Sequence, residues 1–147
     1  MKINILTIGK LKEKYLIDAV NEYRKRLKNF CTLEIIELLE QRTIDLEGEM
    51  LLKRISPESF KIILDIHGKE ISSEEFAKKI SDLALNGQSN LTFVIGGAFG
   101  ISEELRQAAD FKLSLSKMTF THQMTRLILI EQIYRSFKII HNEPYHW

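Results

Sequence analysis

LTFVIGGAFGIS (91–102) leads from an apolar run into a loop with three glycines in five positions, and a serine then opens a helix. The apolar run is typical of a buried strand, and Ser102 is suited to cap the helix that follows. Glycines between a strand and a helix let a ligand approach the backbone closely. The stretch therefore predicts a strand–loop–helix unit that either holds a small molecule or needs its glycines only for tight packing.

Strands and helices alternate along the rest of the chain. Apolar runs with β-branched residues predict strands, and apolar residues at helical spacing predict amphipathic helices. The expected strands are 2–8, 32–39, 60–66, 91–95 and 111–116, and the expected helices are 11–30, 46–55, 72–85, 103–109 and 122–141. This order is typical of an α/β fold with a mostly parallel sheet that helices cover on both faces. We expect a single domain over residues 1–147.

The bulk composition is that of an ordinary globular protein, with 44% apolar and 28% charged residues in a chain of 147. Charge is unevenly distributed around a net value of +1. Residues 1–30 carry eight Lys and Arg against three Asp and Glu, whereas residues 31–90 carry seven against twelve. The basic first segment either steers a polyanion or forms a solvated helix face. Charge alone therefore does not establish nucleic-acid binding.

Cysteine content and hydropathy indicate the cellular compartment of the protein. The single cysteine, Cys31, excludes an internal disulfide framework and fits a reducing compartment. The apolar runs are shorter than the ~18–20 residues that would span a bilayer, and the first residues lack the pattern of a secretion signal. We therefore expect a cytoplasmic protein with no membrane partner.

The residues around the glycine loop disfavour a ligand with phosphates. GGAFG does not fit the dinucleotide fingerprint G-x-G-x-x-G, and no Gly-Lys-Ser/Thr follows it. Glu103 and Glu104 occupy the first turn of the next helix, where they satisfy the helix dipole and would repel a phosphate. The pattern favours a nucleoside without phosphates, including a positively charged one, over an unrelated ATP- or NAD-binding domain. No two of the four histidines are spaced as a helical metal pair, so we expect no metal site.

The expected last helix (122–141) is apolar on most sides, which requires burial on more than one side. Either the core of the monomer or a homodimer interface would provide that burial. Glu131 and Arg135 are four residues apart in this helix, with the acid first. They can form an ordinary helix pair, or Arg135 can direct its guanidinium at a phosphate or a base edge.

Several motifs together resemble one known family. They are LDIHGK (64–69), FVIGGAFG (93–100), LSLSKMTFTHQMTR (113–126), LIEQIYRSFKI (129–139) and PYH (144–146), with IGK (8–10) and EYRKRL (22–27) in agreement. The combination covers essentially the whole chain and is similar to the RlmH family, the ribosomal RNA large subunit methyltransferases H of the SPOUT (α/β-knot) superfamily. The resemblance implies a single-domain SPOUT fold with a C-terminal trefoil knot, a rare exception to ordinary chain connections.

The resemblance also implies an activity. The family transfers a methyl group from S-adenosylmethionine to N3 of a pseudouridine in 23S ribosomal RNA, and it acts on assembled ribosomes as a homodimer built largely on the last helix. We therefore expect an enzyme with S-adenosylmethionine as its cofactor and the ribosome as its partner. Two alternatives stay open: a SPOUT methyltransferase that acts on tRNA, and a non-catalytic ribosome-binding or assembly module of the same fold.

Matched position by position, the resemblance assigns the site residues. The cofactor pocket would be formed by Leu64, Gly96, Leu115, Ser116, Lys117, Met118, Thr119 and Phe120. The catalytic residues on the substrate side would be His122, Arg135, Tyr145 and His146. Tyr145 and His146 would position the base, and either they or water would accept the N3 proton. Arg135 would hold an oxygen or a phosphate and so stabilise negative charge on the imide. Two residues depart from the family pattern: Thr121, where a proline is usual, and Trp147, where Lys or Arg is usual.

Overall fold

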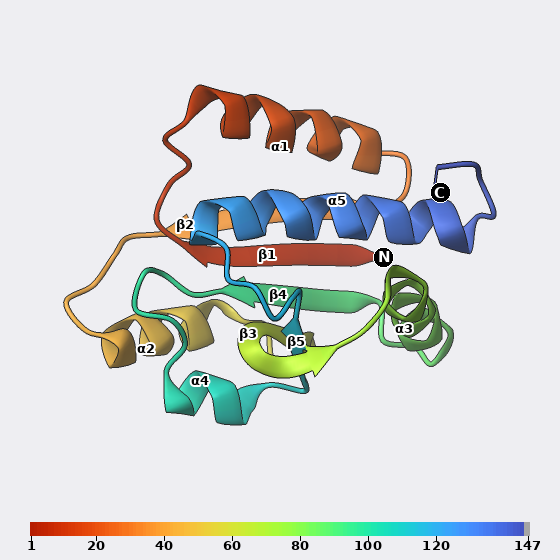
Figure 1. Cartoon of the computed structure of the whole chain (residues 1–147). Coiled ribbons are helices and arrows are strands. Elements are labelled where there is room, and N and C mark those ends of the chain that lie inside the picture. The colour runs from red at the N-terminus through yellow and green to blue at the C-terminus, as the bar shows by residue number, and fades with distance from the viewer. Residues whose placement is uncertain (146–147) are drawn as a thin grey trace.

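The computed structural model describes residues 1–145, in which strands and helices alternate throughout (Figure 1). The strands are β1 (Lys2–Ile8), β2 (Thr32–Leu38), β3 (Phe60–Glu70), β4 (Asn90–Ile95) and β5 (Phe111–Ser114). The helices are α1 (Lys14–Leu27), α2 (Ile44–Arg54), α3 (Ser73–Leu85), α4 (Glu103–Ala108) and α5 (His122–Ile140). Every element that the sequence predicts is present, and no helix in this range has the length and apolarity to cross a membrane.

The five strands form one parallel sheet in the order β2-β1-β4-β3-β5. The predicted α/β fold with a mostly parallel sheet is therefore confirmed. Because the strands run in the same direction, the loops that follow β1, β3, β4 and β5 all meet at one edge of the sheet. The passage of the last helix through a loop, which the resemblance implies, stays a prediction.

Helices cover both faces of the sheet (Figure 1). On one face, α1, α3 and α5 share a core with Ile3 and Ile5 of β1. On the other face, α2 and α4 pack against Leu6 and Ile8 of the same strand. These four side chains are fully buried, as expected for a strand that is covered on both sides.

Two helices begin with side-chain capping contacts: α4 with the cap at Ser102 predicted above, and α3 with the S-x-x-E capping-box pattern of Ser72 and Glu75. Ser72 Oγ accepts a hydrogen bond from the Glu75 amide at 3.0 Å, and the Glu75 carboxylate accepts one from the Ser72 amide at 3.1 Å. Ser102 Oγ likewise accepts from the Leu105 amide at 3.1 Å. These bonds satisfy amides that no helical carbonyl can reach. Local sequence is therefore enough to predict where α3 and α4 begin.

β3 is longer than the sequence predicts. The apolar pattern ends a strand at Ile66, whereas the structure continues it to Glu70. A break in register between Leu64 and Lys69 lets the second half of β3 pair again with β5. The close approach requires Gly68, because a Cβ there would lie 2.7 Å from a carbonyl oxygen of β5. Only this pairing identifies the second half as a strand, since its residues lack apolar alternation.

Two other elements, α1 and β5, are shorter than predicted by two residues or more. α1 begins at Lys14 rather than Leu11, because the Leu11 amide donates to Glu37 at 3.2 Å and holds the preceding loop against β2. β5 ends at Ser114, whose Oγ donates to the Ser116 carbonyl at 3.0 Å. That bond turns the chain out of the sheet, so residues 115 and 116 belong to the loop before α5.

Arg126 of α5 is the largest fully buried side chain in residues 1–145, with 1% of its surface exposed. Its guanidinium forms an ion pair with Glu37 and donates to Thr7 Oγ1 at 3.2 Å and to the Gly9 carbonyl at 3.0 Å. These partners lie at the carboxyl ends of β1 and β2. Arg126 therefore attaches the first turns of α5 to the edge of the sheet where the loops meet.

Arg126→Met should lower the free energy of unfolding by about 3 kcal/mol, because it removes a buried charged donor from Glu37, from the Gly9 carbonyl and from the buried Thr7 hydroxyl. Arg126→Lys should lower it nearly as much, since an ammonium cannot reproduce the forked contacts of a guanidinium. Urea denaturation followed by circular dichroism measures both. As a control, Lys78→Met removes an exposed pair with Asp82 and should cost less than about 1 kcal/mol. Equal losses in Arg126→Met and Lys78→Met would contradict the attaching role of Arg126.

Candidate active site

A cavity of about 570 Å³ opens at the carboxyl edge of the sheet. Three segments line it: residues 64–67 of β3, the glycine loop 96–101 between β4 and α4, and the loop 115–121 between β5 and α5. His122 and Thr125, in the first turn of α5, and Arg106 of α4 also line it. A volume of this size is usual for a pocket that holds a small-molecule ligand.

Most residues that the sequence assigns to the cofactor pocket surround this cavity. Seven of the eight line it: Leu64, Gly96, Leu115, Ser116, Met118, Thr119 and Phe120. Lys117 is not among the lining residues, whereas His122, predicted on the substrate side, is one of them. Segments that are far apart in sequence meet here because parallel strands end at the same edge.

The glycine loop is a tight turn. The Gly100 amide donates to the Gly97 carbonyl at 3.0 Å, and Gly100 has a φ of 89°, in the left-handed region that favours glycine. A Cβ at Gly96 would lie 2.4 Å from the Gly100 carbonyl oxygen. Behind the turn, Glu47 of α2 is buried, and a Cβ at Gly97 would lie 3.2 Å from its Oε1. The glycines therefore allow tight packing and also line the cavity. No local sequence pattern predicts the buried position of Glu47.

Hydroxyl groups organise the loop that leads into α5. Ser116 Oγ accepts a hydrogen bond from the Met118 amide at 3.0 Å. Thr121 Oγ1 accepts from the Met124 amide at 3.2 Å and so caps the helix that His122 begins. Thr121 stands where the family pattern usually has proline. This chain therefore starts α5 with a side-chain cap, which replaces the restricted backbone of proline.

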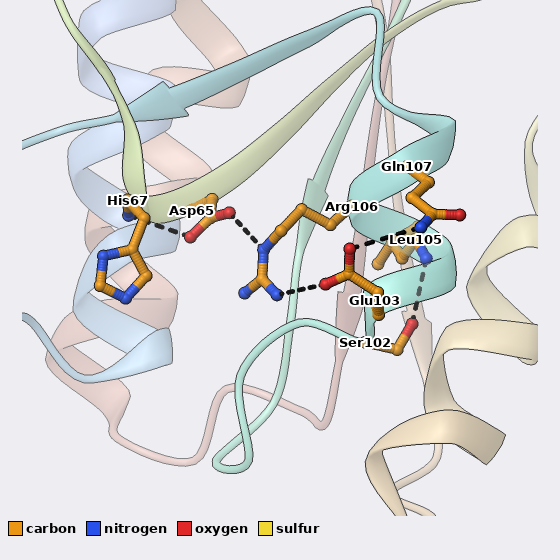
Figure 2. Close-up of polar contacts among 7 residues, drawn as sticks. All are labelled: Asp65, His67, Ser102, Glu103, Leu105, Arg106 and Gln107. Carbon is orange, nitrogen blue, oxygen red and sulfur yellow. Dashed lines mark hydrogen bonds and ion pairs between the residues drawn. The ribbon is translucent and has the colours of Figure 1, made fainter.

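Asp65 and Arg106 form a charge pair at the cavity wall that the sequence reasoning missed (Figure 2). Arg106 Nε donates to Asp65 Oδ2 at 2.7 Å, the His67 amide donates to Oδ1 at 3.0 Å, and Arg106 also pairs with Glu103 at 3.2 Å. Burial raises the pKa of Asp65, but the hydrogen bonds and the charge of Arg106 outweigh it and hold the pKa below its usual value. The signal in the sequence is an acid directly after the apolar run 60–64.

Two further predicted residues, Arg135 and Tyr145, gather around Glu131, on the later turns of α5. Arg135 forms the helix ion pair with Glu131 that its spacing allows, and the Tyr145 hydroxyl donates to Glu131 Oε1 at 3.1 Å. The Arg135 guanidinium lies 4.9 Å from the centre of the Tyr145 ring, which packs edge-on against Tyr134. Burial, together with hydrogen bonds to Tyr23 and Glu131, raises the pKa of Tyr145. Its phenol therefore stays protonated at neutral pH.

The cavity and this second cluster lie at opposite ends of α5. Thirteen positions separate His122 from Arg135, which corresponds to about 20 Å along a helix. Within one chain, the structure does not bring Arg135 and Tyr145 to the cavity. His146 and Trp147 lie outside the described residues.

Comparison with known proteins identifies the family. Residues 1–146 match a family described as "Predicted SPOUT methyltransferase". The chain is 51% identical to the ribosomal RNA large subunit methyltransferase H of Acetivibrio thermocellus and 49% identical to that of Carboxydothermus hydrogenoformans, over 99% of this chain and of each relative. The chain belongs to the RlmH family of SPOUT methyltransferases. The resemblance carried by the sequence motifs is thereby confirmed.

The fold of this SPOUT methyltransferase is shared with a more distant protein. A "probable methylase family protein" from Haemophilus influenzae is similar with a TM-score of 0.58 and 14% sequence identity. The similarity covers 99% of this chain and 70% of the other chain. At such low identity the likeness shows the fold alone.

The residues around the cavity of this SPOUT methyltransferase fit S-adenosylmethionine. Leu64 and Leu115 offer apolar walls for an adenine ring, and Gly96 lines the cavity at the start of the tight turn. Arg106 is neutralised by Asp65 and Glu103, so this wall suits a sulfonium cation better than a phosphate. In the part of the chain that the structure describes, no three His, Cys, Asp or Glu side chains gather as a metal would require.

Asp65→Asn should lower the free energy of unfolding by about 2 kcal/mol at neutral pH, because it removes a buried charged acceptor from Arg106. The native carboxyl has a lowered pKa, so its contribution is complete above the ordinary value of about 4 and disappears as the pH falls through the native value. The difference between wild type and Asp65→Asn should therefore shrink in acid, as urea denaturation at several pH values can measure. Asp82→Asn, at an exposed pair, serves as the control. A difference that is the same at neutral and acid pH would contradict this assignment.

Proposed function

We propose that this protein transfers a methyl group from S-adenosylmethionine to N3 of a pseudouridine in large-subunit ribosomal RNA, and that it acts on assembled ribosomes in the cytoplasm. The observation that carries the proposal is the cavity at the carboxyl edge of the sheet, because its lining is built from the motifs shared with the RlmH family. Two relatives that are 51% and 49% identical over 99% of this chain are named ribosomal RNA large subunit methyltransferases, which supports the same class of substrate for this protein.

The cavity residues would hold the cofactor without phosphate chemistry. Leu64 and Leu115 would contact the adenine, while backbone groups of Gly96 and of the loop 115–120 would meet polar atoms. When bound, S-adenosylmethionine supplies an electrophilic methyl group on a sulfonium. The pair of Asp65 and Arg106 would keep the wall of the cavity close to neutral.

The acceptor nitrogen must lose a proton, because the imide N3 of pseudouridine is protonated at neutral pH. The N3 lone pair forms the new bond to the methyl carbon, and the electron pair of the broken C–S bond goes to sulfur. Tyr145 would position the base through its ring and as a hydrogen-bond acceptor, because its hydroxyl donates to Glu131 and the protonated phenol cannot take the N3 proton at neutral pH. Arg135 would stabilise the negative charge on the imide. The proton would pass to His146 or to water.

A homodimer would complete this site. Met124, Ile128, Glu131 and Arg135 recur at spacings of four and three residues and so share one face of α5. Met124 is 36% exposed and Ile128 is half-buried, so the core of one chain leaves apolar surface on this face. Two α5 helices packed antiparallel through it would place Arg135 of one copy near the cavity of the other. The two clusters that one chain keeps apart would then meet.

Transfer of a labelled methyl group tests the reaction. Wild-type protein should label a pseudouridine of assembled ribosomes, and it should label isolated large subunits, free ribosomal RNA and tRNA far less. The physical reason is that a small protein with a net charge of +1 grips free RNA weakly and needs a preformed ribosomal surface. Label in tRNA would overturn the substrate. Loss of cofactor binding with intact ribosome binding would favour the non-catalytic module.

Mixing two inactive variants tests the shared site. Gly96→Ala should disable the cavity, and Arg135→Ala should disable the substrate side; circular dichroism checks that both variants fold. Co-expressed variants should recover about a quarter of wild-type activity, because half of the dimers are mixed and each mixed dimer holds one intact site of two. No recovery in mixed dimers would show that each chain forms its site alone.

A further inference from the structure

An exposed aromatic ring stands at the rim of the cavity. Phe99 lines the cavity, yet 62% of its surface is exposed. It lies at the tip of the glycine loop, in the turn closed by the hydrogen bond from the Gly100 amide to the Gly97 carbonyl. None of the ring-to-ring contacts found in residues 1–145 includes Phe99. The ring therefore faces solvent on a closed turn.

Neither folding nor the proposed chemistry accounts for this ring. Phe99 belongs to neither of the two hydrophobic cores. Its position in the turn would accept a small polar residue, and such residues are the usual choice in turns. A phenyl ring that stays in water forgoes the stabilisation that burial would give it. Its placement at the mouth of a site for a nucleic-acid substrate indicates an external partner.

We propose that Phe99 stacks on an unpaired nucleobase of the RNA substrate. This inference rests on the proposed function. A base that reaches the cavity must leave its stack, so a neighbouring base loses a stacking partner on one side. Aromatic side chains take that place in proteins that bind single-stranded RNA. A ring on a closed turn suits the role, because little backbone freedom is lost when the base arrives.

The cofactor adenine is a second planar base that this ring could meet, and the structure favours the RNA. The residues that would hold the adenine lie deeper: Leu64 is only 8% exposed, whereas Phe99 projects at the rim. The net charge of +1 gives the protein as a whole little attraction for phosphates, so contacts to bases would add to the affinity that the basic segment 1–30 supplies.

Substitutions at Phe99 test the stacking. Phe99→Ala should weaken affinity for assembled ribosomes and raise KM for them roughly ten-fold, with the affinity for S-adenosylmethionine unchanged. Phe99→Trp should keep wild-type values, and Phe99→Leu, which restores apolar surface without a ring, should behave like Phe99→Ala. Leu85→Ala is the matched control, because Leu85 is 82% exposed at the end of α3 and does not line the cavity.

Three results would overturn the inference. Weaker binding of S-adenosylmethionine by Phe99→Ala with unchanged ribosome affinity would assign the ring to the cofactor. Wild-type behaviour of Phe99→Leu would show that apolar contact suffices without stacking, and wild-type behaviour of Phe99→Ala would remove the contact altogether. If the wild-type protein transfers no methyl group, the proposed function fails, while the ribosome affinities of the same variants still decide the role of Phe99.

Discussion

The buried guanidinium of Arg126 is the contact on which the geometry of the candidate site depends. A charge inside a protein is tolerated only where partners surround it, and here Glu37, Thr7 and the Gly9 carbonyl do so. Because these partners lie at the ends of β1 and β2, α5 can begin at one place only along the sheet edge. The loop 115–121 must then cross the ends of β3 and β4, where it forms one wall of the cavity.

α5 also separates the cavity from the second cluster of predicted residues. Its first turn borders the cavity, and its later turns carry the cluster of Glu131, Arg135 and Tyr145. A helix is a stiff spacer, so these two ends cannot approach each other within one chain. In the proposed dimer, the α5 helix of the partner would lie antiparallel to this one. The later turns of each α5 would then lie beside the first turn of the other, which borders the cavity. Phe99 would then add a contact to the RNA from the rim of the cavity.

The features that could be predicted from the sequence depend on contacts between residues close together in the chain. The capping contacts of Ser72 and Ser102 involve residues three positions away, so the sequence contains all of their geometry. The glycine loop was predictable for the same reason, since its turn closes between Gly97 and Gly100. The cofactor pocket required the family motifs as well, because its lining comes from three separate strand ends. Asp65 escaped prediction, as its partner Arg106 lies on another element.

The sequence by itself determined the order of strands and helices, the α/β class, the positions of the caps and the membership of the RlmH family, because each depends on nearby residues or on whole motifs. The tertiary structure decided the second half of β3, which is a strand only through its pairing with β5. It also decided that Arg126 is buried, and that Arg135 lies about 15 Å along α5 beyond Thr125, which lines the cavity. These features depend on contacts between residues far apart in the chain, and no local pattern encodes such contacts.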